Sequence, residues 1–206
     1  NVYILYAAGS ENIEDTSSIK LLVWDSVPAE YTAESSPDYT LNVYNYQEIN
    51  GVTYPVFCFT ELAAKQMTDD VYVCAYYDDN GTPVYSAPFK YSILQYAYNM
   101  INGGTDDDML QKLLNSMLNY GSMAQQYFDY NTDRLADDRY FNVTVTGGTL
   151  EDGFTYGLYN ANEAITVTAP AKKEGYPFAY WLDQYGYSYG DGESTYPFSG
   201  ELYGDT

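Results

Sequence analysis

The chain has 206 residues, of which 46% are hydrophobic and 18% charged, a composition typical of a folded protein rather than a disordered one. Its formal net charge of −21 repels nucleic-acid phosphate and anionic lipid head groups, so we exclude both as partners. No apolar run is long enough to span a bilayer, so we expect no membrane insertion.

The first 90 residues alternate between strand-like segments and turns. Six segments predict β-strands, namely residues 1–8, 19–24, 39–46, 52–59, 71–77 and 82–90. The second is apolar except for Lys20, which predicts burial on both faces. Asn50-Gly51 and Asp79-Asn80-Gly81 predict tight hairpin turns. Residues 60–68 are helix-like and short, and two prolines place the sixth strand at a sheet edge.

Residues 91–134 form the one long segment with a clear helical period, and they predict a helical hairpin with a turn at residues 102–104. Thr105 is the predicted N-cap of the second helix, followed by three aspartates. The apolar stripe of this helix comprises Leu110, Leu113, Leu114, Met117, Leu118, Gly121, Ala124, Gln125 and Phe128. Glycine inside a helix costs about 1 kcal/mol relative to alanine, so Gly121 predicts a close approach to a sheet or to the partner helix.

The pattern changes near Asp138 into a Gly- and Tyr-rich region that reads as all-β. We therefore predict an α+β fold with two domains. Residues 1–138 form an antiparallel β-sheet packed on the helical hairpin, because the two apolar helix faces need a sheet beneath them. Residues 139–206 form a small β-rich domain.

The first domain carries the motifs KQMTDDVYVCAYYDDNGTPVYSAPFKYSILQYAYNMI and LNYGSMAQQYFDYNTDRLADD. Over residues 39–138 the chain resembles an uncharacterised α+β module of large secreted or wall-bound proteins of Gram-positive anaerobes. The resemblance holds at many spaced positions, and it implies an extracellular or cell-wall location.

The second domain carries VTVTGGTLEDGFTYGLYNANEAITVTAPAKKEGYPFAYWLDQYG, which resembles the bacterial surface repeats related to the internalin B-repeat. The matching positions are Gly157, Tyr159, residues 165–169, Gly175, Tyr176, Phe178, Trp181, Asp183 and Gly186. The resemblance implies a small fold similar to a β-grasp. Such repeats close with a strand like TLTAVY after Gly-Asp-Thr, whereas this sequence ends at Gly-Asp-Thr, which implies a missing strand and a half-covered core around Trp181.

Neither family brings catalytic residues or a cofactor, so the resemblance implies a non-catalytic surface module with a structural or adhesive role, such as a spacer or filament building block. Its partners would be other surface proteins or further copies of itself. Residues 1–8 are the most obvious donor for a strand exchanged between copies. The alternative is a glycan-binding module that accompanies a secreted carbohydrate-active enzyme and binds polysaccharide. Its candidate aromatic platform comprises Tyr185, Tyr187, Tyr189, Tyr196 and Tyr203, with Trp181.

Cys58 and Cys74 are the two cysteines of the chain. Their strands are joined by a short link and could be neighbours in one sheet, and an extracellular location permits a bridge. The pair is therefore a disulfide candidate that would close a loop of about 15 residues, worth about 3 kcal/mol.

Three acidic clusters could supply hard oxygen ligands, namely residues 106–108, 78–80 and 191–193. We interpret them as a helix N-cap, a hairpin turn and a solvated loop, since none has the spacing of an EF-hand. The chain contains no histidine, which removes the usual general base near neutral pH. Paired carboxylates could still hydrolyse glycosides, but no pattern singles out a pair among 29 acidic residues. We predict neither a metal site nor a catalytic residue.

Overall fold

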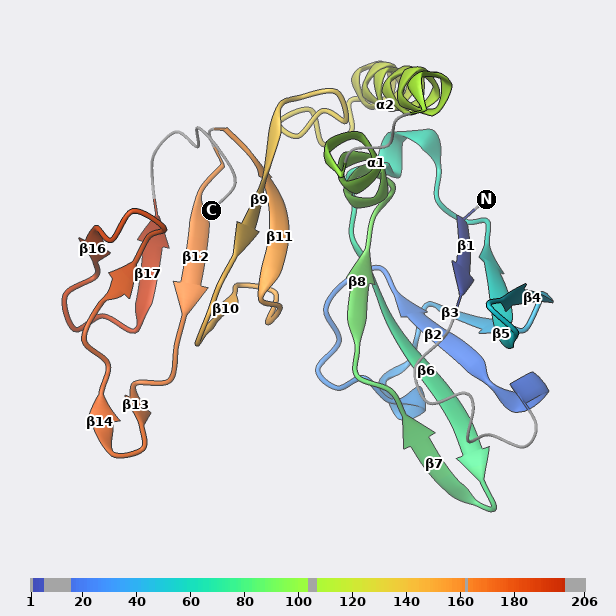
Figure 1. Ribbon diagram of the computed structural model, residues 1–206, viewed down its shortest axis with the longest axis horizontal. Coiled ribbons are helices and arrows are strands. Elements are labelled where there is room, and N and C mark those ends of the chain that lie inside the picture. Colours follow the sequence, from blue (N-terminus) through green and yellow to red (C-terminus); the bar gives the residue numbers. More distant parts are fainter. Residues whose placement is uncertain (1, 6–15, 104–106, 162, 199–206) are drawn as a thin grey trace. The chain divides into compact units, whose positions relative to one another are not determined.

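The structure is a computed structural model that describes residues 2–5, 16–103, 107–161 and 163–198. The chain divides into two compact units, Asn1–Asp137 (unit 1) and Asp138–Thr206 (unit 2). The described residues form two α-helices and many antiparallel strands in several small sheets, which is an α+β fold (Figure 1).

The described residues of unit 1 form two antiparallel sheets. One has the order β1 (Val2–Leu5), β5 (Val52–Phe59), β4 (Asn45–Ile49). The other has the order β3 (Tyr39–Asn42), β2 (Lys20–Trp24), β6 (Val71–Asp79), β7 (Thr82–Tyr85), and β8 (Phe89–Tyr91) pairs with the first part of β6. Short 3-10 turns lie at η2 (Thr16–Ser18), η3 (Ala33–Ser35) and η4 (Ala64–Gln66).

The main core of unit 1 lies between these two sheets. It contains Phe57 and Phe59 from β5 together with Leu21, Val23, Val71, Val73 and Ala75 from β2 and β6. The other face of β2 is also buried, as its sequence predicts, because the loop after it folds back. Trp24 packs edge-on against Tyr31 at 5.5 Å between ring centroids, and its indole N–H donates to the carbonyl oxygen of Ser35 at 3.4 Å.

Two of the predicted strands are each divided in the structure. Residues 39–46 form β3, which pairs with β2, and the start of β4, which pairs with β5. The chain passes from one sheet to the other at Tyr44, whose N–H donates to the carbonyl oxygen of Val56 at 2.8 Å. Residues 82–90 likewise divide into β7 and β8, both of which pair with β6. The alternation of side chains continues through the first division, so sequence pattern alone does not reveal it.

The helical hairpin consists of α1 (Ile93–Asn102) and α2 (Asp108–Phe128). It lies at one end of the strands of unit 1 rather than over a sheet (Figure 1), which corrects the predicted packing. The N-cap of α2 is Asp107, whose carboxylate accepts from the N–H groups of Met109 and Leu110 at 2.9 and 3.1 Å. The predicted cap, Thr105, lies outside the described residues.

The predicted close approach at Gly121 is confirmed. The neighbouring residues, however, belong neither to a sheet nor to α1. A Cβ at this position would lie 2.6 Å from Sδ of Met67, 3.3 Å from the carbonyl oxygen of Ala64 and 3.2 Å from Cβ of Ala136. The predicted helix over residues 60–68 is the single turn η4, which packs on α2 here. Two residues of the predicted stripe, Leu113 and Phe128, are exposed instead of buried.

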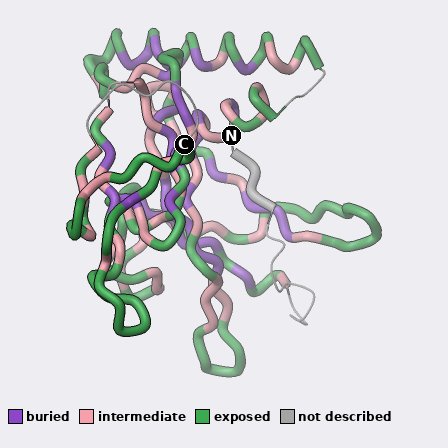
Figure 2. The backbone as a smooth tube through the Cα atoms, turned by 60° about the vertical axis from the view of Figure 1, so that its left-hand side comes forward, coloured by how far each residue is buried: buried purple, intermediate pink, exposed green. Residues whose placement is uncertain are grey.

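Unit 2 is built from short antiparallel strands. β9 (Tyr140–Thr144) pairs with β11 (Tyr156–Asn160), and a three-stranded sheet has the order β10 (Thr149–Leu150), β12 (Ile165–Thr168), β17 (Thr195–Phe198). Two small hairpins join β13 (Lys172–Lys173) to β14 (Tyr176–Pro177) and β15 (Trp181–Leu182) to β16 (Ser188–Tyr189). The core contains Val143, Val145, Leu150, Ile165, Val167 and Trp181. Figure 2 marks buried residues in purple, and among them are residues of the core strands and of one side of α2.

The N-terminal strand is already paired within unit 1. Val2 lies opposite Phe59 and Leu5 opposite Val56 in the antiparallel pairing of β1 with β5. Donation of the predicted segment to another copy, as in a strand exchange, would therefore require this pairing with β5 to open. Within the described part of the chain, neither helix has the length and apolar character needed to cross a membrane.

Candidate functional site

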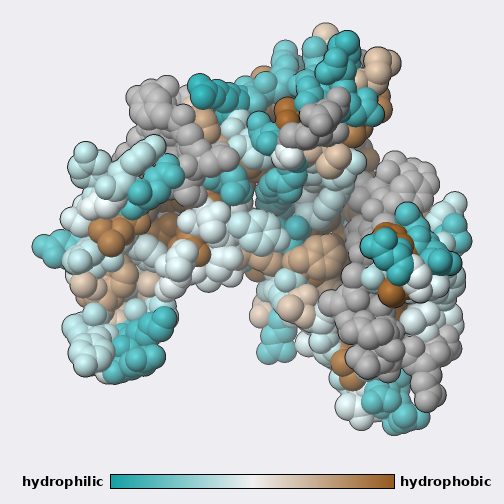
Figure 3. All heavy atoms as spheres, in the orientation of Figure 1, coloured by the Kyte–Doolittle hydropathy of each residue, from teal (hydrophilic) through white to brown (hydrophobic). Residues whose placement is uncertain are grey.

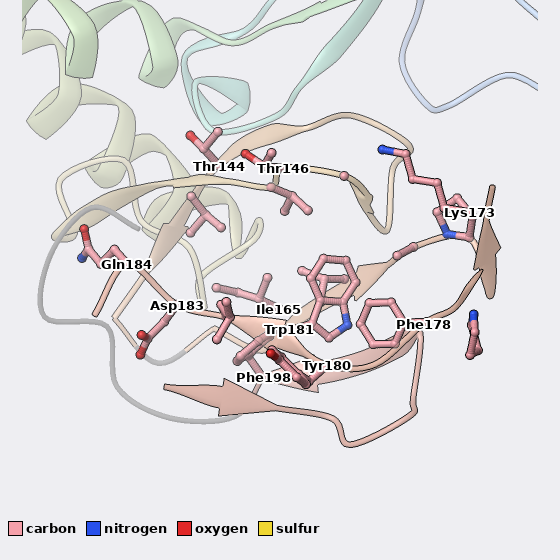
Figure 4. Close-up of a pocket in the computed structure, with 18 of the residues that line it drawn as sticks. Thr144, Thr146, Ile165, Lys173, Phe178, Tyr180, Trp181, Asp183, Gln184 and Phe198 are labelled. Carbon is pink, nitrogen blue, oxygen red and sulfur yellow. The ribbon is translucent and has the colours of Figure 1, made fainter. Parts of the chain in front are cut away.

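A cavity of about 660 Å³ opens beside the core of unit 2. Its apolar walls come from β9, β12, β15 and β17 and from the segment between β12 and β15, and they include Val143, Val145, Ile165, Val167, Phe178, Tyr180, Trp181 and Phe198. In Figure 4, Trp181 and Phe178 lie side by side in the middle of the site, and Lys173 lies toward one end. Figure 3 shows brown hydrophobic atoms at the surface of unit 2 among paler and teal ones.

Trp181 forms one wall of the cavity and also belongs to the core, with 9% of its surface exposed. The ring packs against Phe178 at 5.2 Å between centroids. Gly148 makes room for it, because a Cβ there would lie 2.5 Å from Cη2 of Trp181 and 2.5 Å from the carbonyl oxygen of Thr168. The buried indole N–H has no hydrogen-bond partner among the described residues, and a buried donor of this kind normally has one.

Asp183 lies at one end of the cavity (Figure 4) and organises the turn between β15 and β16. Its Oδ1 accepts from the backbone N–H groups of Tyr185 and Tyr187, both at 2.9 Å, and its Oδ2 accepts from the hydroxyl of Tyr189 at 3.1 Å. Desolvation alone would raise the pKa of Asp183, but the hydrogen bonds, first those from Tyr187 and Tyr185, outweigh it and lower the pKa. The carboxylate therefore stays ionised and holds the turn.

The four described tyrosines of the predicted platform do not form one surface. Tyr185 and Tyr187 are 78% and 68% exposed in the turn that Asp183 holds. Tyr189 and Tyr196 instead pack against the ring of Phe198, at 5.1 and 4.9 Å between centroids. The fifth residue of the predicted platform, Tyr203, lies outside the described residues.

Of the predicted platform, only Trp181 is among the described aromatic residues that line the cavity. Besides Trp181 and Phe178, they include Tyr176 and Tyr180, which are 76% and 51% exposed. Sequence reasoning did not single out these tyrosines as ligand contacts. The available signal was their position, since both fall within the GYPFAYW segment that supplies the buried tryptophan.

The cysteine pair is separated by the core of unit 1. Cys58 lies on β5 and Cys74 on β6, and these strands belong to different sheets, so the expectation that they are neighbours is wrong. Phe57 and Phe59 face the core between the sheets, so Cys58 faces the opposite side, and Cys74 alternates with Val73 in the same way. Both thiols are free and the predicted bridge is not formed.

The acidic clusters occupy turns, caps and exposed loops. Oδ1 of Asp78 accepts from the N–H of Gly81 at 2.6 Å, which supports the interpretation of this segment as a turn. Asp107 caps α2, while Asp191 and Glu193 are exposed in the loop before β17. Within the described ranges, no three or more carboxylates and thiols are grouped so as to hold a metal ion.

The cavity is suited to an apolar occupant. Most of its walls are aliphatic or aromatic, and the polar groups Lys173, Asp183, Thr144 and Thr146 lie around them (Figure 4). Apolar walls with a few polar groups are typical of sites that bury most of a ligand. Comparisons with protein-family models, curated proteins and solved structures find no match for this chain.

Proposed function

We propose that the chain is a non-catalytic module of an extracellular or cell-wall protein of a Gram-positive anaerobe, with a structural or adhesive role. The cellular location in this proposal comes from the sequence resemblance of both units to secreted and surface modules. The proposal includes the assignment of unit 2 to a β-grasp-like surface repeat, which the short antiparallel strands around Trp181 support.

The observation that carries the proposal is the open apolar cavity beside Trp181. β17 lies at the edge of its sheet among the described strands and pairs with β12, and Phe198 of this strand lines the cavity. A sheet edge beside apolar walls accepts an extended strand, whose backbone pairs with the edge while alternate side chains enter the cavity. The fitting occupant is an apolar closing strand of the type TLTAVY, which would link this module to the polypeptide that supplies the strand.

The test extends the chain by TLTAVY directly after Thr206, with TSTASS as the matched polar control. In a Trp24→Phe background, Trp181 is the only tryptophan and reports on the cavity. We expect the apolar extension to shift the emission of Trp181 to shorter wavelength and to raise the melting temperature of unit 2. The variant Ala169→Phe, which places a ring in the cavity, should remove both effects. Identical spectra and melting temperatures for the two extensions would contradict the proposal.

Glycan binding is the second candidate, favoured by the exposed rings of Tyr176 and Tyr180 at the cavity. Aromatic faces of this kind stack on sugars, and Lys173 and Asp183 supply polar groups nearby. It predicts saturable quenching of Trp181 by cell-wall or plant oligosaccharides, abolished by Tyr180→Ala and unaffected by the matched change Tyr44→Ala in unit 1. The structural role predicts no response to oligosaccharides, and incubation with polysaccharides should release no reducing ends.

A further inference from the structure

Helix α2 carries a second apolar stripe on the side that faces solvent. Its large members are Met109, Leu113, Tyr120, Met123 and Tyr127, which are 74%, 64%, 63%, 65% and 83% exposed. The residues that α2 buries against unit 1 include Leu114, Leu118, Ser122 and Gln125, which lie on the opposite side of the helix. Figure 2 shows the exposed residues along one side of α2 and the buried ones along the other. The buried face anchors the helix, whereas the side chains of the stripe are mostly exposed to solvent.

The spacing of this stripe indicates what kind of surface it fits. With Ser116, its positions follow steps of four, three, four, three and four residues. At 100° per residue all six fall within a wedge of roughly 80° along the helix. Alternating steps of three and four produce a continuous seam whose side chains fit between those of a second α-helix. The spacing of the stripe therefore suits packing against a second α-helix.

The stripe is also symmetric about Leu118. Met109 and Tyr127 lie nine residues on either side of it, Leu113 and Met123 lie five, and Ser116 and Tyr120 lie two. When two such helices run antiparallel and cross at the level of this residue along the helix axis, Met109 meets the second copy's Tyr127 and Leu113 meets the second copy's Met123. The small Ser116 lies opposite the large Tyr120 ring, so volumes are complementary. This self-complementarity is what a two-fold interface between identical chains requires.

Charge favours the same arrangement. Two chains that each carry a net charge of −21 repel one another, and they can associate most easily where little of that charge is concentrated. The stripe contains no charged residue, and α2 as a whole contains one aspartate, Asp108, and one lysine, Lys112. Antiparallel helices also align their dipoles favourably. An uncharged stripe packs best against another uncharged surface, and the same stripe on a second copy is such a surface.

We propose that α2 forms a two-fold interface in which this stripe packs antiparallel against the α2 stripe of a second copy of the chain. The contact spans roughly 27 Å of helix, because 18 residues rise 1.5 Å each. A single helix pair lies at the small end of specific interfaces, which bury about 1,200–2,000 Å². The dimer is therefore weak and forms in the micromolar range. Association strengthens as salt is added, since salt screens the repulsion between the two acidic chains.

The test is sedimentation equilibrium of the whole chain from low to several hundred micromolar, at low and high salt. We expect a monomer–dimer equilibrium for the native protein. Leu113→Glu and Met123→Lys, made singly, should each weaken the dimer by about tenfold or more, because each places a charge in an apolar seam. The matched control Ile49→Glu, an exposed apolar residue on β4, should leave the equilibrium unchanged.

The double variant Leu113→Glu with Met123→Lys decides the orientation. In the antiparallel pairing each introduced glutamate faces the introduced lysine of the second copy, so the double variant should regain the dimer. In a parallel pairing like charges would meet and the double variant would stay monomeric, which would overturn the proposed interface. A native protein that is monomeric at every concentration would also overturn it. Unchanged circular dichroism and melting temperature, expected for exposed positions, show that each variant remains folded.

Discussion

The side chain of Gln125 holds the backbone of Ala136 inside unit 1. Its Oε1 accepts from the N–H of Ala136 at 2.8 Å, and its Nε2 donates to the carbonyl oxygen of Arg134 at 2.8 Å. Both Gln125 and Ala136 are fully buried. One carboxamide thus fastens the segment after α2 against the helix, and Nε2 also reaches Oγ1 of Thr68 at 3.2 Å.

Replacing Gln125 by methionine keeps the volume of the side chain and removes these hydrogen bonds. The N–H of Ala136 would then be buried without its acceptor, which costs about 1–3 kcal/mol. With the further bonds lost, we expect the free energy of unfolding of unit 1 to fall by about 3 kcal/mol in urea titrations. The matched change Gln126→Met, at an exposed neighbouring position, should alter it by less than about 0.5 kcal/mol. Equal effects at the two positions would contradict this role.

Gly121 should not tolerate a larger residue. Alanine gains about 1 kcal/mol of helix propensity, but its Cβ would overlap with Sδ of Met67 and crowd Ala136. Overpacking of this kind costs about 1–3 kcal/mol, so we expect Gly121→Ala to destabilise unit 1 by about 1 kcal/mol. Asn119→Ala, on the exposed side of the same helix, should be neutral or stabilising. In a Met67→Ala background the Gly121→Ala change should become stabilising, and a double-mutant cycle without coupling would exclude the contact.

Stability should fall in strongly alkaline solution. The hydrogen bond to Asp69, helped by desolvation, raises the pKa of Tyr130 to about 12, and desolvation raises the pKa of Tyr91 to about 12. The folded state therefore keeps protons that the unfolded chain loses near pH 10. The stabilisation is complete below pH 10 and is lost as pH rises to about 12. Thermal unfolding across this window should be less pH-dependent in Tyr130→Phe, while Tyr44→Phe should behave like the native chain.

The two thiols should react with alkylating agents at different rates. Sγ of Cys74 is buried and lies 3.3 Å from the carbonyl oxygen of Ser86, and burial raises the pKa of this thiol. Cys58 is half-buried. Because the thiolate is the reacting species, we expect iodoacetamide to modify Cys58 first and Cys74 only after unfolding. Non-reducing mass measurement of the native chain should show two free thiols. A mass lower by two hydrogen atoms would show instead that the two cysteines form a disulfide.

Local features of this chain could be predicted from the sequence because they depend on neighbouring residues. Asn50-Gly51 and Asn80-Gly81 adopt the positive φ angles that tight hairpins require. The apolar run of β2 is buried on both faces, and the spacing of Leu114 and Leu118 places them on the buried side of α2. These outcomes follow from backbone preference and side-chain periodicity, which a short window contains.

Only the tertiary structure decided which apolar residues meet. Leu113 and Leu114 are adjacent and equally apolar, yet Leu113 is exposed and Leu114 buried, because the rest of unit 1 packs against only one side of α2. Cys58 and Cys74 are close in sequence but lie on opposite sides of a core, because their strands belong to different sheets. The cavity beside Trp181 likewise arises from strands distant in sequence. Side-chain periodicity predicts that one face of a helix or strand is apolar. Which residues pack against that face depends on contacts between segments that are distant in the sequence.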